Sequence, residues 1–167
     1  IVTNNIAHTS SPKRKNIFGV YEAVYLYYSL RGKYDAESCK KSKMALENAA
    51  TVEPDNALLW ALLSRLYLNC YIFKLDPNPE DFQKAKAYAE KALWLDQNCQ
   101  YAYKALAWVH LLSGKINDCE QAIRQCVDLN PKSTSITGNM GFLMICIGKY
   151  TQGFHLLLNA LSLNPVQ

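Results

Sequence analysis

The sequence lacks a long apolar run. No stretch of its 167 residues approaches the roughly 18 uninterrupted apolar residues that a membrane-spanning helix needs. The polar start, IVTNNIAHTSSPKRKN, also lacks the apolar segment of a secretory signal. Charged residues make up only 19% of the chain, and the formal net charge of +4 is too small to indicate nucleic acid by itself. We therefore expect a soluble, cytoplasmic protein that does not bind a membrane. We do not expect nucleic acid to be its partner.

Metal-ligand spacing is absent as well. The six cysteines form no C-x-x-C pair, and no histidine lies at ligand spacing from them. On a helix, Cys119 and Cys126 would be separated by about 10.5 Å of rise, which is beyond the reach of a disulfide. The sequence therefore predicts no metal, no cofactor, and reduced structural thiols as in a cytosolic protein.

The chain shows no arrangement of acid, base and nucleophile. His110 occupies an aromatic core position of the helix pattern, so we expect it to be buried in the core. His155 is expected to face outward, and His8 lies in the leading segment. Nucleophilic catalysis therefore has no support, and we predict that the protein is not an enzyme.

What the sequence does contain is a repeat. GKINDCEQAIRQCVDLNP (114–131) and GKYTQGFHLLLNALSLNP (148–165) share a Gly-Lys opening and a Leu-Asn-Pro ending. Pro165 lies 34 positions after Pro131. A period of this length is typical of two antiparallel helices per unit.

The same register continues toward the N-terminus. Counting back 34 positions from Pro131 reaches Gln97, where KALWLDQN supplies the same helix ending. The preceding ending, at Pro54, lies 43 positions before Gln97, so this unit has nine extra residues. We place them near 71–80, because the two prolines there cannot lie inside a helix.

The repeat predicts an all-α fold, a right-handed α-solenoid of about four helix-turn-helix units. The helices are expected at 17–31, 36–51, 56–72, 80–95, 100–112, 116–129, 134–147 and 150–162. Residues 1–16 are expected to be a leader or linker to a single domain, 17–167, with units at about 17–55, 56–99, 100–133 and 134–167. The start at Ile1 and the end just after a helix suggest a fragment of a longer chain.

The units resemble the tetratricopeptide repeat family, whose pattern is W-x2-L-G-x2-Y, then A-x3-F, a small residue and Pro. The matching residues are Trp60, Leu63, Ser64, Tyr67, Ala85, Ala89 and Ala92; Tyr103, Leu106, Ala107, His110, Cys119, Ile123, Cys126 and Pro131; and Thr137, Met140, Gly141, Met144, Gly153, Leu157, Ala160 and Pro165. Thr137 departs from the pattern, because it fills a large aromatic position. The resemblance implies a non-enzymatic scaffold that binds a peptide or partner protein in a concave groove.

A narrower resemblance concerns YEAVYLYYSLRGKY and LENAATVEPDNALLWALLSRLY. These segments are similar to tetratricopeptide regions that follow adenylate cyclase or DNA-binding domains in bacterial signalling proteins. This resemblance implies a regulatory region of a larger signalling protein, although no catalytic residue of a cyclase can be placed on the sequence.

Helical spacing predicts which side chains of the first helices face the groove. They are Leu58, Ala61, Arg65 and Asn69; Tyr101, Lys104, Trp108 and Leu112; and Ser135, Gly138, Asn139 and Phe142. From these we select Arg65, Asn69, Tyr101, Lys104, Trp108, Asn139 and Phe142 as partner-binding residues. Trp108 is the favoured anchor; the alternative is that Trp108 and Phe142 only pack between units. Some family members capture a terminal carboxylate, but the apolar or small Leu58, Ala61 and Gly138 break that cluster, so a partly apolar peptide or helix is expected.

Two further surfaces are considered. Tyr21, Tyr25 and Tyr28 share a helical stripe that we expect to be buried rather than used for stacking nucleic-acid bases. Phe154, Leu158 and Leu161 should be exposed on the last helix, where another helix of the parent protein would cover them or they would favour self-association, for example as a homodimer. An oligomerisation module is therefore the main alternative function, and a nucleic-acid-binding helical repeat is a weaker one.

Overall fold

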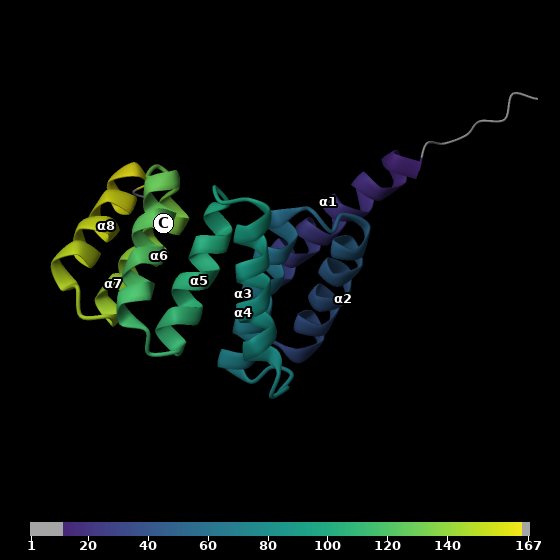
Figure 1. Cartoon of the computed structure of the whole chain (residues 1–167), viewed down its shortest axis with the longest axis horizontal. Coiled ribbons are helices and arrows are strands. Elements are labelled where there is room, and N and C mark those ends of the chain that lie inside the picture. The colour runs from purple at the N-terminus through teal and green to yellow at the C-terminus, as the bar shows by residue number, and fades with distance from the viewer. Residues whose placement is uncertain (1–11, 165–167) are drawn as a thin grey trace, which may run out of the picture.

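The computed structural model describes residues 12–164, with the side chains of residues 19–164. This part of the chain forms eight α-helices in antiparallel pairs, about four helix-turn-helix units. Figure 1 shows the pairs following one another in a row, from α1 and α2 at one end to α7 and α8 at the other. The helices are α1 (Pro12–Leu30), α2 (Ala36–Val52), α3 (Ala57–Phe73), α4 (Asp81–Leu95), α5 (Gln100–Leu112), α6 (Ile116–Leu129), α7 (Thr134–Cys146) and α8 (Tyr150–Leu163).

Residues with positive φ make the tight turn within each pair. Gly114 (φ +69°) and Gly148 (φ +82°) lie between α5 and α6 and between α7 and α8, where glycine adopts the left-handed conformation without steric cost. Tyr34 (φ 51°) and Lys74 (φ 50°) take the equivalent role in the first two units. In the second unit, α3 is longer than α5, and residues 74–80 form an extended loop, which together accommodate the insertion.

The helices approach closely where the repeat places small residues. Ala85, Ala89 and Ala92 of α4 are completely buried. Ser64 of α3 donates a hydrogen bond from Oγ to the carbonyl oxygen of Ala85 at 2.6 Å. Small side chains on α4 therefore let α3 pack against it, as ridges-into-grooves packing requires.

Neighbouring units are joined through both rows of helices. The first helices α3, α5 and α7 contact one another in sequence, and each second helix contacts the first helix of the next unit.

The bounds of α2 to α8 lie within one residue of those expected. Helix α1 differs, because it begins at Pro12 rather than at residue 17; proline fits the first turn of a helix, so residues 12–16 are helical rather than a linker. The remainder of the expected leader, residues 1–11, lies outside the described residues.

The tyrosine stripe of α1 is not buried as expected. The face of α1 that packs against the other helices carries Val20, Ala23 and Tyr27 instead. This face is rotated about one residue from the predicted one. The exposed fractions of the predicted stripe are 72% for Tyr21, 73% for Tyr25 and 36% for Tyr28.

The prediction of reduced thiols is wrong for one pair of cysteines. Cys39 of α2 and Cys70 of α3 form a disulfide, with their Cα atoms 6.7 Å apart. Cys119 and Cys126, which are too far apart for a disulfide, lie on one helix, whereas the Cys39–Cys70 bond joins helices of consecutive units. Because disulfides are rare in cytosolic proteins, the bond removes the argument for a cytoplasmic location that rested on reduced thiols. The four free cysteines are Cys99, Cys119, Cys126 and Cys146.

Candidate partner-binding groove

A row of side chains connects the first helices of the second, third and fourth units. The guanidinium carbon of Arg65 lies 4.5 Å from the centroid of the Trp108 ring. Trp108 donates a hydrogen bond from Nε1 to Oδ1 of Asn139 at 3.0 Å. The rings of Trp108 and Phe142 lie 6.2 Å apart between centroids, at an interplanar angle of 31°. We call Arg65, Trp108, Asn139 and Phe142 the groove row.

Three members of this row occupy the same position of the repeat. Phe142 lies 34 positions after Trp108, and Trp108 lies 43 positions after Arg65, which is one period plus the nine-residue insertion. Arg31, which directly follows α1, lies 34 positions before Arg65. The period alone could therefore have placed Arg31 at the equivalent position of the first unit, but Arg31 is not among the residues predicted from the sequence.

Trp108 packs between units, which is one of the two roles expected of it. Its ring is half-buried and packs against the hydrophobic clusters on both sides of the third unit. Phe142, in contrast, is 50% exposed. Phe142 therefore offers more free apolar surface to a partner than Trp108, whose ring also supports the stacking of units.

Cationic side chains gather along the same face. Burial, together with the nearby charges of Arg65 and Arg31, lowers the pKa of Lys104 to about 8. Burial also lowers the pKa of Arg65. Both shifts arise because a charged group loses hydration, and like charges close to Lys104 add to the cost.

The described residues provide no carboxylate for these cations. Within residues 19–164, no Asp or Glu oxygen lies within 4 Å of the charged nitrogens of Arg65 or Lys104. Arg65 Nη1 and Asn69 Oδ1 are buried and have no hydrogen-bond partner. The two residues lie one turn apart on α3.

Contacts around the end of α1 continue this set of cationic and aromatic residues toward the first unit. The guanidinium carbon of Arg31 lies 4.8 Å from the ring centroid of Tyr28. Burial and the neighbouring Tyr101 hydroxyl raise the pKa of Tyr28. Tyr101, which was predicted for the groove, is half-buried and packs against the core, so it links α5 to this end of the surface.

The residues predicted to face the groove do not all lie in one place. Leu112 lies at the insertion loop, where it lines a hollow of about 730 Å³ with Tyr71 and Pro77. At the other end, Phe142 and Leu161 line a hollow of about 380 Å³ between α7 and α8.

The face predicted for self-association adjoins this second hollow. Its three predicted residues are exposed by 57% for Phe154, 64% for Leu158 and 49% for Leu161. Leu161 belongs both to this face and to the lining of the hollow beside Phe142. The hollow beside Phe142 and the apolar face of α8 therefore share Leu161.

The two histidines of the described residues differ in burial. His110 is half-buried, and burial lowers its pKa. His155 is exposed, as expected. In the described part of the chain, no group of three His, Cys, Asp or Glu residues is arranged to hold a metal ion, and no described helix is long and apolar enough to span a membrane.

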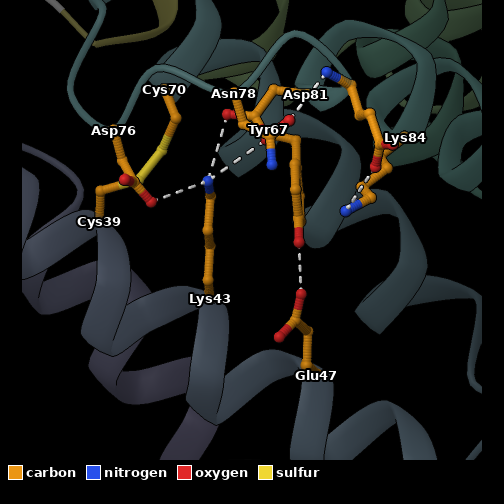
Figure 2. A network of polar contacts seen from close by, with 10 residues as sticks. Cys39, Lys43, Glu47, Tyr67, Cys70, Asp76, Asn78, Asp81 and Lys84 are labelled. Carbon is orange, nitrogen blue, oxygen red and sulfur yellow. Dashed lines mark hydrogen bonds and ion pairs between the residues drawn. A yellow bond between two sulfur atoms is a disulfide. The ribbon is translucent and has the colours of Figure 1, made fainter.

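A second cluster, which the sequence analysis missed, joins α2 to the second unit (Figure 2). Lys43 Nζ lies 3.2 Å from Asp81 Oδ2 and 3.5 Å from Asp76 Oδ2. Tyr67 donates a hydrogen bond from its hydroxyl to Glu47 Oε1. No sequence motif predicts these contacts, because Asp76 belongs to the insertion and the other residues come from three different helices.

Comparison with known proteins agrees with a tetratricopeptide-like architecture. No family model matches the sequence. The BBSome complex member BBS4 of Bos taurus is 26% identical over 125 residues, which cover 75% of this chain and 23% of that protein. The chain thus spans about a quarter of the length of this curated relative.

Two solved structures of MamA share the fold. One has a TM-score of 0.56 at 15% identity, covering 88% of this chain and 74% of MamA. The other has a TM-score of 0.54 at 13% identity, covering 98% of this chain and 97% of MamA. This chain therefore has the all-α tetratricopeptide-type fold of paired antiparallel helices, in about four helix-turn-helix units.

Proposed function

We propose that this chain is a non-enzymatic scaffold that binds a peptide or partner protein in its groove, within a larger protein. The observation that carries the proposal is the groove row, which runs across three units beside cations that have no carboxylate partner among the described residues. The bovine relative is, by its name, a member of a protein complex. Participation in an assembly is therefore consistent with the fold and with this surface.

The groove favours a segment that combines an apolar and an acidic group. The exposed ring of Phe142 provides an apolar contact, and aromatic side chains are common anchors at interfaces. An acidic group beside Arg65 and Lys104 would compensate their buried charge.

The proposal is tested by selecting ligands from a random peptide library displayed on phage. We expect enriched peptides that carry an acidic residue near an aromatic or aliphatic one. Their binding to a Lys104→Ala and Phe142→Ala double variant should be weaker by about tenfold or more, since each contact contributes about 1 kcal/mol or more.

A matched variant shows whether the groove is the surface concerned. Lys40→Ala and Phe154→Ala together also remove one lysine and one phenylalanine, both from exposed positions outside the groove row. Selected peptides should bind this variant as they bind the unchanged protein. Equal binding to both double variants, or selection of peptides that depend on Phe154, would contradict the proposal.

Self-association is the second candidate, favoured by the exposed Phe154, Leu158 and Leu161. A dimer seen by analytical ultracentrifugation, and dissociated by Leu158→Lys, would support an oligomerisation module. A monomer at every concentration would exclude it. Binding of nucleic acid would instead show a steep dependence of affinity on salt concentration.

The finer role, a regulatory region of a bacterial signalling protein, is a proposal supported only by the resemblance of residues 21–34 and 46–67. The relatives reported above give no support to this particular class of protein. The sequence of the parent chain on either side would test it, because a neighbouring cyclase or DNA-binding domain would name the regulated process.

A further inference from the structure

Three side chains, one turn apart along α2, attach the first unit to the second. Cys39 is covalently bonded to α3, Lys43 forms ion pairs with the insertion loop and α4, and Glu47 accepts a hydrogen bond from α3. Figure 2 shows these contacts side by side. The partners on the second unit are Cys70, Asp76, Asp81 and Tyr67.

The first unit depends on this junction because α1 contributes little to the core. Among the described side chains of α1, residues 19–30, only Val20, Ala23 and Tyr27 are buried. In a stack of repeats, each unit is stabilised by contacts with its neighbours. Such units can open locally while the rest of the structure stays folded.

We infer that the Cys39–Cys70 disulfide is a redox-controlled latch, which holds α1 and α2 against the second unit when oxidised and releases them when reduced. The bond joins residues 31 positions apart and closes a loop that contains the turn between α2 and α3. Breaking it leaves the Lys43 ion pairs and the Tyr67 hydrogen bond in place.

The latch also controls one end of the groove. Tyr28 belongs to α1 and Arg31 directly follows this helix, and the charge of Arg31 is close enough to act on Arg65 and Lys104. When the first unit opens, Arg31 moves away from these two cations. Reduction thereby changes the charge of the surface that binds the partner, although the latch itself does not depend on the nature of that partner.

The exchange requires a dithiol reductant and proceeds in two steps. A thiolate of the reductant attacks one sulfur of the pair, which forms a mixed disulfide and releases the other cysteine as a thiolate that takes up a proton. The second thiol of the reductant, as a thiolate, then attacks the mixed disulfide and releases the second cysteine. The cysteines gain two electrons and two protons, and the dithiol becomes a disulfide.

Attack on the bond is coupled to opening of the junction. Cys39 and Cys70 are both buried, with exposed fractions of 3% and 0%. An external thiolate reaches them only when α2 separates from α3. Reduction should therefore be slow in the closed state, and should accelerate under conditions that loosen the first unit.

The bond itself is counted by alkylation of the intact chain. Unfolded in iodoacetamide without reductant, the oxidised protein should take up four alkyl groups, one for each free cysteine. After treatment with dithiothreitol it should take up six, the total number of cysteines. Six groups without reductant, in protein isolated under non-reducing conditions, would show that the latch does not form.

Hydrogen exchange followed by mass spectrometry tests the release. After reduction, amides of α1 and α2 should exchange at least about tenfold faster, while those of α5 to α8 change by less than about twofold. Cys39→Ala with Cys70→Ala should exchange like the reduced protein with or without dithiothreitol, and Cys146→Ala, which removes an exposed free thiol, should respond like the unchanged chain. Unchanged exchange in α1 and α2, or equal acceleration in all eight helices, would overturn the inference.

Discussion

The carbonyl oxygen of Gly153 lies 2.9 Å from the point that a Cβ atom on Gly141 would occupy. These two glycines bring α7 and α8 together at their crossing. A Cβ atom on Gly153 would in turn lie 2.6 Å from Cγ1 of Ile145 and 2.8 Å from the carbonyl oxygen of Gly141. Contacts this short with backbone atoms cannot be relieved by a change of rotamer.

Gly153→Ala should therefore destabilise the protein, although alanine is the better helix former. We expect a loss of about 1–3 kcal/mol in the free energy of unfolding, because the two helices must move apart. Gly138→Ala is the matched control. Its Cβ atom would meet only Ala160 Cβ, at 3.6 Å, so it should stabilise the protein by up to about 1 kcal/mol. Denaturant unfolding of the two variants measures both effects, and destabilisation by Gly138→Ala alone would contradict this packing.

Replacing only one partner of the buried ion pair between Lys43 and Asp81 should lower the free energy of unfolding. Asp81→Leu leaves a buried ammonium group with only the more exposed Asp76 as partner, and we expect a loss of about 3 kcal/mol. Adding Lys43→Met removes the unpaired charge and should recover part of that loss. Lys41→Ala, which breaks the exposed pair with Glu37, should change stability by less than about 1 kcal/mol. Equal losses for the single and double variants would show that the charge of Lys43 is not important.

Lys104 should make stability rise with pH in the alkaline range. Its pKa falls from 10.5 to about 8 on folding, so between these pH values the unfolded chain binds more protons than the folded one. Stability from this group therefore increases as pH rises from about 8 to about 10.5. Other groups titrate in the same range, so the relevant quantity is the difference between the unchanged protein and Lys104→Met. The variant should be more stable near pH 7, and its advantage should shrink as the pH rises; a constant difference would contradict the lowered pKa.

Substitutions of Trp108 and Phe142 should affect stability and peptide binding to different degrees. Trp108→Ala removes a ring that packs between units and bonds Asn139, so it should lower the melting temperature as well as affinity. Phe142→Ala removes a half-exposed ring, so its main effect should be on the binding of selected peptides. Thermal unfolding and titration calorimetry of both variants distinguish these effects. A larger drop in melting temperature for Phe142→Ala would assign it to the core instead.

The period of the sequence predicts the helices better than it predicts the site. Helices α2 to α8 could be placed because Gly114, Gly148 and the prolines at the ends of units mark the turns. The buried face of α1 could not be derived, since the repeat pattern is weakest there and its tyrosines are compatible with either face. The disulfide and the Lys43 pairs depend on how two units sit against each other, which the repeat period alone does not specify.

For the predicted groove residues, too, helical spacing predicts the shared face better than it predicts the contacts between units. Helical spacing placed Arg65, Trp108, Asn139 and Phe142 on one face, and the structure connects them. Spacing could not show that Trp108 is half-buried, or that Arg31 is close enough to lower the pKa of Lys104. Those facts depend on contacts between units.

The three tryptophans of the chain allow the groove to be tested by one spectrum. Trp108 donates its indole hydrogen to Asn139 in the groove, Trp60 donates to the carbonyl oxygen of Pro54, and Trp94 is 80% exposed on α4. In ¹H–¹⁵N correlation spectra of the labelled protein, titration with a library-selected peptide should shift the Trp108 indole signal and leave those of Trp60 and Trp94 in place. A shift of the Trp60 or Trp94 signal, with the Trp108 signal unmoved, would place the partner outside the groove and contradict the proposed function.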